Sequence, residues 1–152
     1  MRNFIFLLLT GLLLLSQGVS AQSKKALKKF QDARQLVQQQ QYAQALEELN
    51  EAIEDEPNYV EALMFAGDIQ KRLGYPEKSL PYYEKAIAAN APYYVDFFYG
   101  QALFEATEYE KAKKVLQRYA QSPQANSKYL PEVNRLIESS DFAMTAKANA
   151  KE

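Results

Sequence analysis

Apolar residues along most of this chain recur at steps of three and four, the spacing that places them on one face of a helix. Between Tyr42 and Ile53 an apolar stripe occupies positions 42, 45, 46, 49, 52 and 53, and residues 26–39 follow the same spacing. No segment alternates apolar and polar residues with a period of two, and β-branched residues are few. The pattern therefore predicts an all-α protein after its first 21 residues.

This helical pattern repeats about every 34 residues. A shift of 34 aligns Ala33 with Gly67 and Ala52 with Ala86, and a further shift of 33 takes Gly67 to Gly100. Small residues thus return at one point of each unit, where they let two antiparallel helices approach closely. Because a glycine inside a helix costs about 1 kcal/mol relative to alanine, two of them at one repeat position indicate a packing requirement.

Turn and cap residues divide the units. Gly74 suits the left-handed position after a helix, and Pro76 and Pro92 suit the start of the helix that follows each of them. Two pairs match the capping box that begins many helices, namely Asn58 with Glu61 and Thr107 with Glu110.

The repeated helix–turn–helix unit resembles the tetratricopeptide repeat (TPR). The first unit matches the family pattern at all six diagnostic positions, which are Ala33, Tyr42, Ala45, Leu49, Ala52 and Pro57. The second unit has Pro76 where the family has tyrosine, and the third has Tyr119 where the family has a small residue. The resemblance implies a TPR-type α-solenoid of antiparallel helix pairs with repeats over about 26–59, 60–92 and 93–121. A related helical-hairpin repeat is the alternative.

A further apolar stripe follows the third unit and consists of Tyr129, Leu130, Val133, Leu136 and Ile137. Pro131 is tolerated in the first turn of a helix, where backbone amides lack partners in any case. Since a solenoid needs a final helix to cover its last repeat, we predict a capping helix over about 127–140. It would close a TPR domain of residues 22–140, with 141–152 as a helix extension or tail.

The first 21 residues have the pattern of a secretory signal peptide. Arg2 supplies the positive charge, residues 4–15 form the apolar run, and Val19, Ser20 and Ala21 form a small-residue cleavage site. The run is shorter than the roughly 20 residues that span a bilayer, and an uncleaved anchor is the alternative. We expect an exported mature chain from about Gln22, in the periplasm or at the outer membrane of a Gram-negative bacterium.

Composition narrows the possible chemistry. The chain has no cysteine and no histidine, so it can form neither a disulfide nor a zinc site of ordinary composition, and it lacks the commonest general base. We expect no cofactor and no metal, and we predict a non-catalytic protein. A carboxylate-based hydrolase is the minor alternative, since carboxylates alone can hydrolyse glycosides.

Charge narrows the possible partners. Without Arg2 the chain has 17 basic and 19 acidic residues, a net charge of −2, which does not indicate nucleic-acid binding. Four lysines crowd residues 24–29, and acidic residues crowd 47–61. We interpret these groups as solvated faces with attraction between neighbouring helices. A charged docking patch, or a membrane-binding surface at the lysines, is the alternative; otherwise we expect membrane contact only through the signal peptide or an associated envelope complex.

The family resemblance also implies a concave groove lined by the first helix of each unit. It assigns to that protein-binding groove Arg34, Glu61, Met64, Asp68, Lys71, Arg72, Tyr94, Phe97, Gln101 and Phe104. The set lacks the regular Lys/Asn arrangement with which some TPR domains grip a C-terminal carboxylate. Each residue has a second interpretation as packing or as a solvated charge, and Asp68 could pair with Lys71 on its own helix.

An aromatic run over residues 93–99 stands out in the third unit. It is either buried between the second and third units, or it projects one or two rings such as Tyr94 and Phe97 as binding anchors.

We therefore predict a cell-envelope scaffold that holds a peptide segment or helix of a partner protein. The alternative, also from resemblance, is the N-terminal TPR module of a larger peptidoglycan-binding protein of the OmpA-like, β-propeller-associated kind.

Overall fold

The computed structural model describes residues 23–150, so the predicted signal peptide at 1–21 lies outside the described residues. The described part is all helical and has no strand, as predicted. Its helices are α1 (Lys24–Gln38), α2 (Tyr42–Asp55), α3 (Val60–Arg72), α4 (Pro76–Ala88), α5 (Val95–Glu105), α6 (Tyr109–Gln121) and α7 (Leu130–Asn149).

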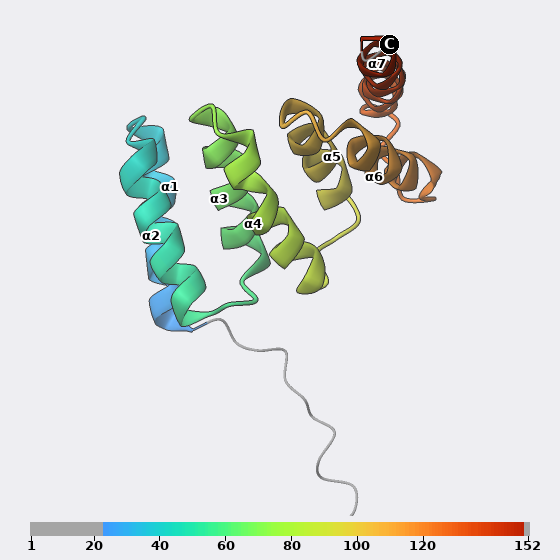
Figure 1. The fold of residues 1–152 in the computed structure, drawn as a ribbon. Coiled ribbons are helices and arrows are strands. Elements are labelled where there is room, and N and C mark those ends of the chain that lie inside the picture. Colours follow the sequence, from blue (N-terminus) through green and yellow to red (C-terminus); the bar gives the residue numbers. More distant parts are fainter. Residues whose placement is uncertain (1–22, 151–152) are drawn as a thin grey trace, which may run out of the picture.

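The helices form three antiparallel pairs that stand side by side, with α7 at the end (Figure 1). In each pair the first helix packs on the second, and α1, α3 and α5 form one layer of the solenoid (Figure 1). This arrangement is the predicted TPR-type solenoid.

The turn inside each pair uses the same backbone conformation. Its left-handed residue is Gln40, Gly74 or Thr107, with φ of 59°, 85° and 63°. The next amide closes the turn in each case, as when the Tyr75 N–H donates to the Gln70 carbonyl at 2.9 Å. The prediction for Gly74 is therefore confirmed, and the same motif ends α1 and α5 without a glycine.

The two capping-box predictions are wrong. Thr107 is the left-handed residue after α5, and α6 begins one residue beyond Glu108 without a side-chain cap. Asn58 also fails to cap α3, because the buried Tyr59 occupies the position before that helix. The predictions for Pro76 and Pro131 are confirmed, since both lie in the first turn of their helices.

Small residues lie where the paired helices cross. A Cβ atom on Gly67 would lie 3.0 Å from the Tyr83 ring, and one on Gly100 would lie 2.5 Å from the Leu116 side chain. Ala33 is fully buried at the equivalent position of the first pair. The packing requirement inferred from the repeat is thus present in the structure.

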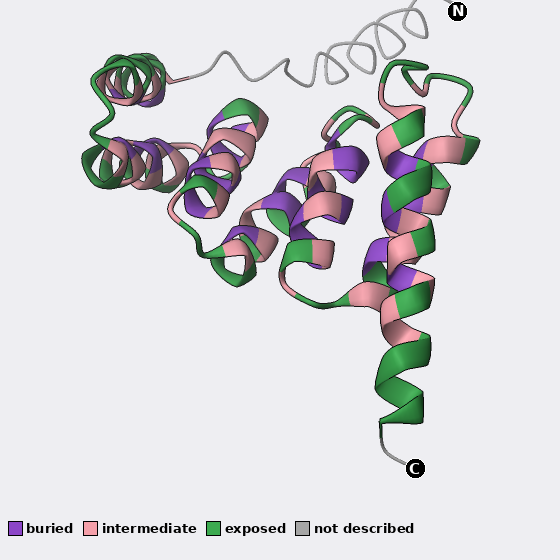
Figure 2. Cartoon of the chain, turned by 90° about the horizontal axis from the view of Figure 1, so that it is seen from above, coloured by how far each residue is buried: buried purple, intermediate pink, exposed green. Residues whose placement is uncertain are grey.

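The first half of α7 covers the last pair, where Val133 and Leu136 pack with Phe97, Leu116 and Tyr119. The helix then continues to Asn149, so residues 141–149 are a helix extension. Figure 2 shows that this second half is mostly exposed.

The N-terminal lysines face the acidic helix beside them. Lys25 pairs with Asp55 at 2.7 Å, and Lys29 pairs with Glu48 at 2.8 Å and with Glu51 at 2.7 Å. These contacts join α1 to α2 and fit the interpretation of the two charged groups as neighbouring, mutually attractive faces.

Candidate functional site

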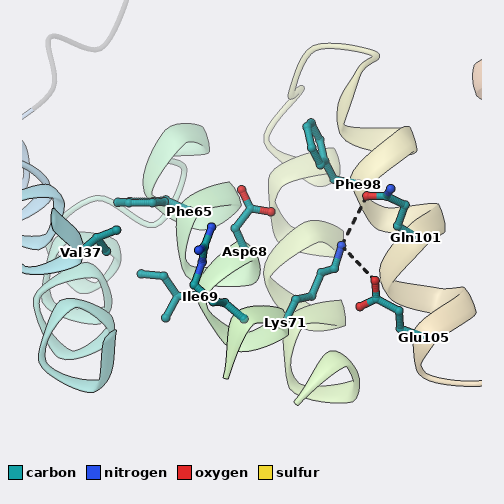
Figure 3. Close-up of a pocket in the computed structure, with 9 residues that line it drawn as sticks. Val37, Phe65, Asp68, Ile69, Lys71, Phe98, Gln101 and Glu105 are labelled. Carbon is teal, nitrogen blue, oxygen red and sulfur yellow. Dashed lines mark hydrogen bonds and ion pairs between the residues drawn. The ribbon is translucent and has the colours of Figure 1, made fainter. Parts of the chain in front are cut away.

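A groove runs across α1, α3 and α5 and consists of two adjoining cavities. The larger, of about 480 Å³ (Figure 3), is lined by Val37, Phe65, Asp68, Ile69, Lys71, Arg72, Phe98, Gln101 and Glu105. The smaller, of about 240 Å³, is lined by Phe30, Arg34, Glu61, Met64, Phe65, Asp68 and Tyr94. Because Phe65 and Asp68 line both cavities, we treat them as one surface, the concave groove.

Eight of the ten residues assigned to the groove from the sequence line it: Arg34, Glu61, Met64, Asp68, Lys71, Arg72, Tyr94 and Gln101. They come from α1, α3, α5 and the residue before α5. Phe97 and Phe104 line neither cavity.

The placement of Phe97 in the groove is wrong. Its side chain is only 5% exposed and stacks on the Tyr129 ring, with centroids 4.8 Å apart. The segment that leads into α7 covers this face of the third pair. The repeat position that lines the groove in the first two pairs is therefore buried in the third. Phe104 is half-buried and packs edge-on against Tyr109 at 5.4 Å, which removes it from the groove lining as well.

Sequence reasoning missed Phe65 and Phe98, the two aromatic residues that line the larger cavity. They occupy the same position of the second and third units, 33 residues apart. An aromatic residue that returns at one repeat position was the available signal for them.

The aromatic run divides between the two predicted roles. Tyr99 is buried between the second and third pairs, and its hydroxyl donates to Glu84 Oε1 at 2.7 Å. Tyr93 stacks on Tyr119. Tyr94 is 41% exposed and lines the groove, and it is joined there by Phe98 and not by Phe97.

The cations of the groove are partly engaged. The Lys71 ammonium does not pair with Asp68 but reaches α5, where it lies 3.5 Å from Gln101 Oε1 and 3.7 Å from Glu105 Oε1 (Figure 3). The Arg72 guanidinium lies over the Tyr42 ring, 5.5 Å from its centroid. Lys71 is thus held toward the α5 side, and Arg72 toward α2.

Asp68 lies at the centre of the groove. The Tyr83 hydroxyl, from α4 beneath it, donates to Asp68 Oδ1 at 2.6 Å. Burial raises the pKa of the Asp68 carboxyl, although the hydrogen bond from Tyr83 and the charges of Lys71 and Arg72 oppose that shift. The same burial, with the negative charge of Asp68, raises the pKa of Tyr83, so this hydroxyl stays a donor.

A family model described as "Tetratricopeptide repeat" matches residues 30–95 and 71–126, which together span more than half of the chain. The chain belongs to the tetratricopeptide repeat family. None of the curated proteins compared with this TPR chain matches it.

Solved structures share the TPR fold of this chain. The first TPR of Spaghetti (RPAP3), bound to the HSP90 peptide SRMEEVD, is 20% identical with a TM-score of 0.70, over 80% of this chain and 98% of that one. The MamA RS-1 ArsTM double mutant is 18% identical with a TM-score of 0.72, over 83% and 69%. The Sgt2 TPR domain from Aspergillus fumigatus is 17% identical with a TM-score of 0.67, over 86% and 85%.

Within residues 23–150, no three acidic side chains gather closely enough to hold a metal ion. None of the helices in that range is both long and apolar enough to cross a membrane.

Proposed function

We propose that this protein is a non-catalytic scaffold that binds a segment of a partner protein in its concave groove. The observation that carries the proposal is the continuity of the groove, which crosses three helices and is lined by both apolar and charged side chains. Apolar lining residues supply affinity for a peptide, and charged lining residues supply selectivity among peptides. The likeness to a TPR structure that holds a peptide supports this use of the fold.

The groove of this chain favours a mixed segment over a purely acidic one. Its lining contains three cations, Arg34, Lys71 and Arg72, and three anions, Glu61, Asp68 and Glu105. A partner made only of acidic residues would meet as many like charges as opposite ones.

A matched pair of exposed tyrosines tests the proposal. Tyr94 lines the groove and is 41% exposed, whereas Tyr75 lies outside it and is 46% exposed. Each precedes a helix, α5 and α4 respectively. We expect a photo-cross-linking amino acid at position 94 to capture a protein from envelope extract, and the same group at position 75 to capture none. Equal capture at both positions would contradict the groove proposal.

We further propose that the protein is exported and acts in the periplasm or at the outer membrane. The basic, apolar and small-residue regions of residues 1–21 support this proposal. Expression of the whole chain in a Gram-negative host should give a periplasmic protein whose first residue, by mass spectrometry, is at or near Gln22. An intact N-terminus in the cytoplasmic fraction would contradict it.

A further inference from the structure

Asp68 is the acidic residue that both cavities of the groove share. It lies on α3, the middle of the three helices that line the groove. In Figure 3 its carboxylate points into the cavity, with Phe65 toward α1 and Phe98 toward α5. A segment that crosses the groove from α1 to α5 must therefore pass over this carboxylate.

Only one of the two carboxylate oxygens of Asp68 accepts a hydrogen bond within the described chain. Tyr83 donates to Oδ1 at 2.6 Å, and no donor from residues 23–150 reaches Oδ2. The cations around it do not fill that position. Among the described residues, no ion pair joins Asp68 to Arg34 across the groove or to Lys71 and Arg72 on its own helix.

An occupant of the groove would strip water from the free oxygen of Asp68. Burying a carboxylate without a compensating partner is costly. A neutral or acidic side chain at this point would add nothing to the partial relief that the charges of Lys71 and Arg72 give, whereas a lysine or arginine would relieve the cost further with a charge-assisted hydrogen bond. The surroundings also suit a long basic side chain, because its aliphatic stem packs on apolar surface and its cationic head is attracted to aromatic faces such as those of Phe65 and Phe98.

We propose that the groove binds a partner segment through a lysine or arginine side chain that pairs with Asp68 between Phe65 and Phe98. The inference rests on the proposed function and adds the chemistry of the partner, namely a basic residue flanked by apolar ones. The opposite arrangement, an acidic segment held by Arg34, Lys71 and Arg72, is the competing outcome of the test.

Peptide selection tests the partner chemistry without a known partner. Residues 22–152, which contain the whole described fold, are used to select phage-displayed random heptapeptides in wild-type form and as Asp68→Asn. We expect the wild-type protein to enrich lysine or arginine at one position beside apolar residues. The variant should keep the apolar preference and lose the basic one.

Binding constants then isolate the contribution of the peptide's positive charge to its affinity for the groove. The best selected peptide is synthesised with its basic residue and again with uncharged norleucine at that position. Wild-type protein should bind the basic form at least about tenfold more tightly, and Asp68→Asn should bind both forms equally. Asp141→Asn is the matched control, because Asp141 lies on α7 and pairs with Lys113 outside the groove; it should behave as wild type.

The outcomes separate this inference from the proposed function. Peptides that lose binding to Phe98→Ala but carry no basic preference, or an acidic one, would overturn the role of Asp68 and leave the groove as a binding site. The same holds if the basic preference survives in Asp68→Asn. Failure of the wild-type protein to select any groove-dependent peptide would overturn both proposals.

Discussion

At the scale of single residues, Asp68 is better suited to binding than to folding. Burial raises its pKa, which means that the folded chain disfavours the ionised carboxylate relative to the unfolded chain. This penalty is absent below the pKa of the unfolded chain, about 4, and grows as pH rises through the folded pKa. A residue kept in a groove at a cost to stability is a candidate for function.

The variant Asp68→Asn measures this cost. Its amide oxygen can still accept from Tyr83, and it has no charge to desolvate. We expect its free energy of unfolding at pH 7 to equal or exceed that of wild type by about 1 kcal/mol or less, and the difference to shrink at acidic pH. Urea unfolding of both proteins at several pH values checks this.

The other ionisable groups around Asp68 set the control for that comparison. Tyr83 faces it from α4, Lys71 and Arg72 lie on its own helix, and Arg34 and Glu105 lie across the groove on α1 and α5. All five are unchanged in the variant, so the difference between the two proteins isolates Asp68. A variant less stable than wild type at pH 7 would mean that the hydrogen bond from Tyr83 outweighs the cost of burial.

Gly100 is the second residue with a sharp prediction. Helix propensity alone says that Gly100→Ala should stabilise α5 by about 1 kcal/mol. The new Cβ would, however, lie 2.5 Å from the fully buried Leu116, and overpacking of this kind costs about 1–3 kcal/mol. We expect a net loss of about 1 kcal/mol, read from the shift of the urea midpoint.

Gly67→Ala is the matched control for that variant. Its Cβ would meet the Tyr83 ring at 3.0 Å, a less severe approach than that at Gly100. We therefore expect a smaller loss. If the Gly100→Ala variant were more stable than the Gly67→Ala variant, helix propensity and not the close approach would determine the change in stability at position 100.

At the scale of elements, the sequence predicted the helices better than their environment. The spacing of apolar residues predicted α1, α2 and α7, because the partners of an amphipathic face do not alter its period, and the repeat extended the prediction to α3 to α6. The repeat could not predict the burial of Phe97, since the unit is the same as in earlier pairs and only the covering segment near Tyr129 differs. Gln40 and Thr107 adopt the left-handed conformation without the glycine that usually signals it.

The two halves of α7 should differ in their contribution to stability. The first half covers Phe97, Leu116 and Tyr119, whereas the second half is largely exposed and carries Phe142 at 77% exposure. Truncation after Ser140 should lower the melting temperature by no more than a few degrees. Truncation after Ser127 should expose the core beneath α7 and give a protein that melts much lower or aggregates.

Circular dichroism melts of the two truncated proteins check this difference. Both truncations remove the ion pair between Lys113 and Asp141, at 2.6 Å, which is partly exposed and contributes little. Equal losses in the two proteins would mean that the exposed half of α7 packs on something that residues 23–150 do not include.

At the scale of the whole molecule, the core is a series of neighbouring clusters. One joins α1 to α3, a second joins α3 to α6, and a third joins α5 to α7. The concave groove lies across this series. Its two walls, with Phe65 on one side and Phe98 on the other, therefore pack in different clusters. The distance between Phe65 on α3 and Phe98 on α5 therefore depends on how the second and third units pack, which the sequence of either unit alone does not determine.

This serial arrangement predicts local unfolding. Leu49 and Leu116 are fully buried and occupy the same position of the first and third units, and truncation of either to alanine should cost about 2–5 kcal/mol. Because each unit contacts only its neighbours, Leu49→Ala should speed amide hydrogen exchange mainly in α1 to α3, and Leu116→Ala mainly in α5 to α7. Mass spectrometry of the exchanged peptides checks this. A uniform increase in both variants would mean that the clusters unfold as one unit, and the walls of the groove would then move together.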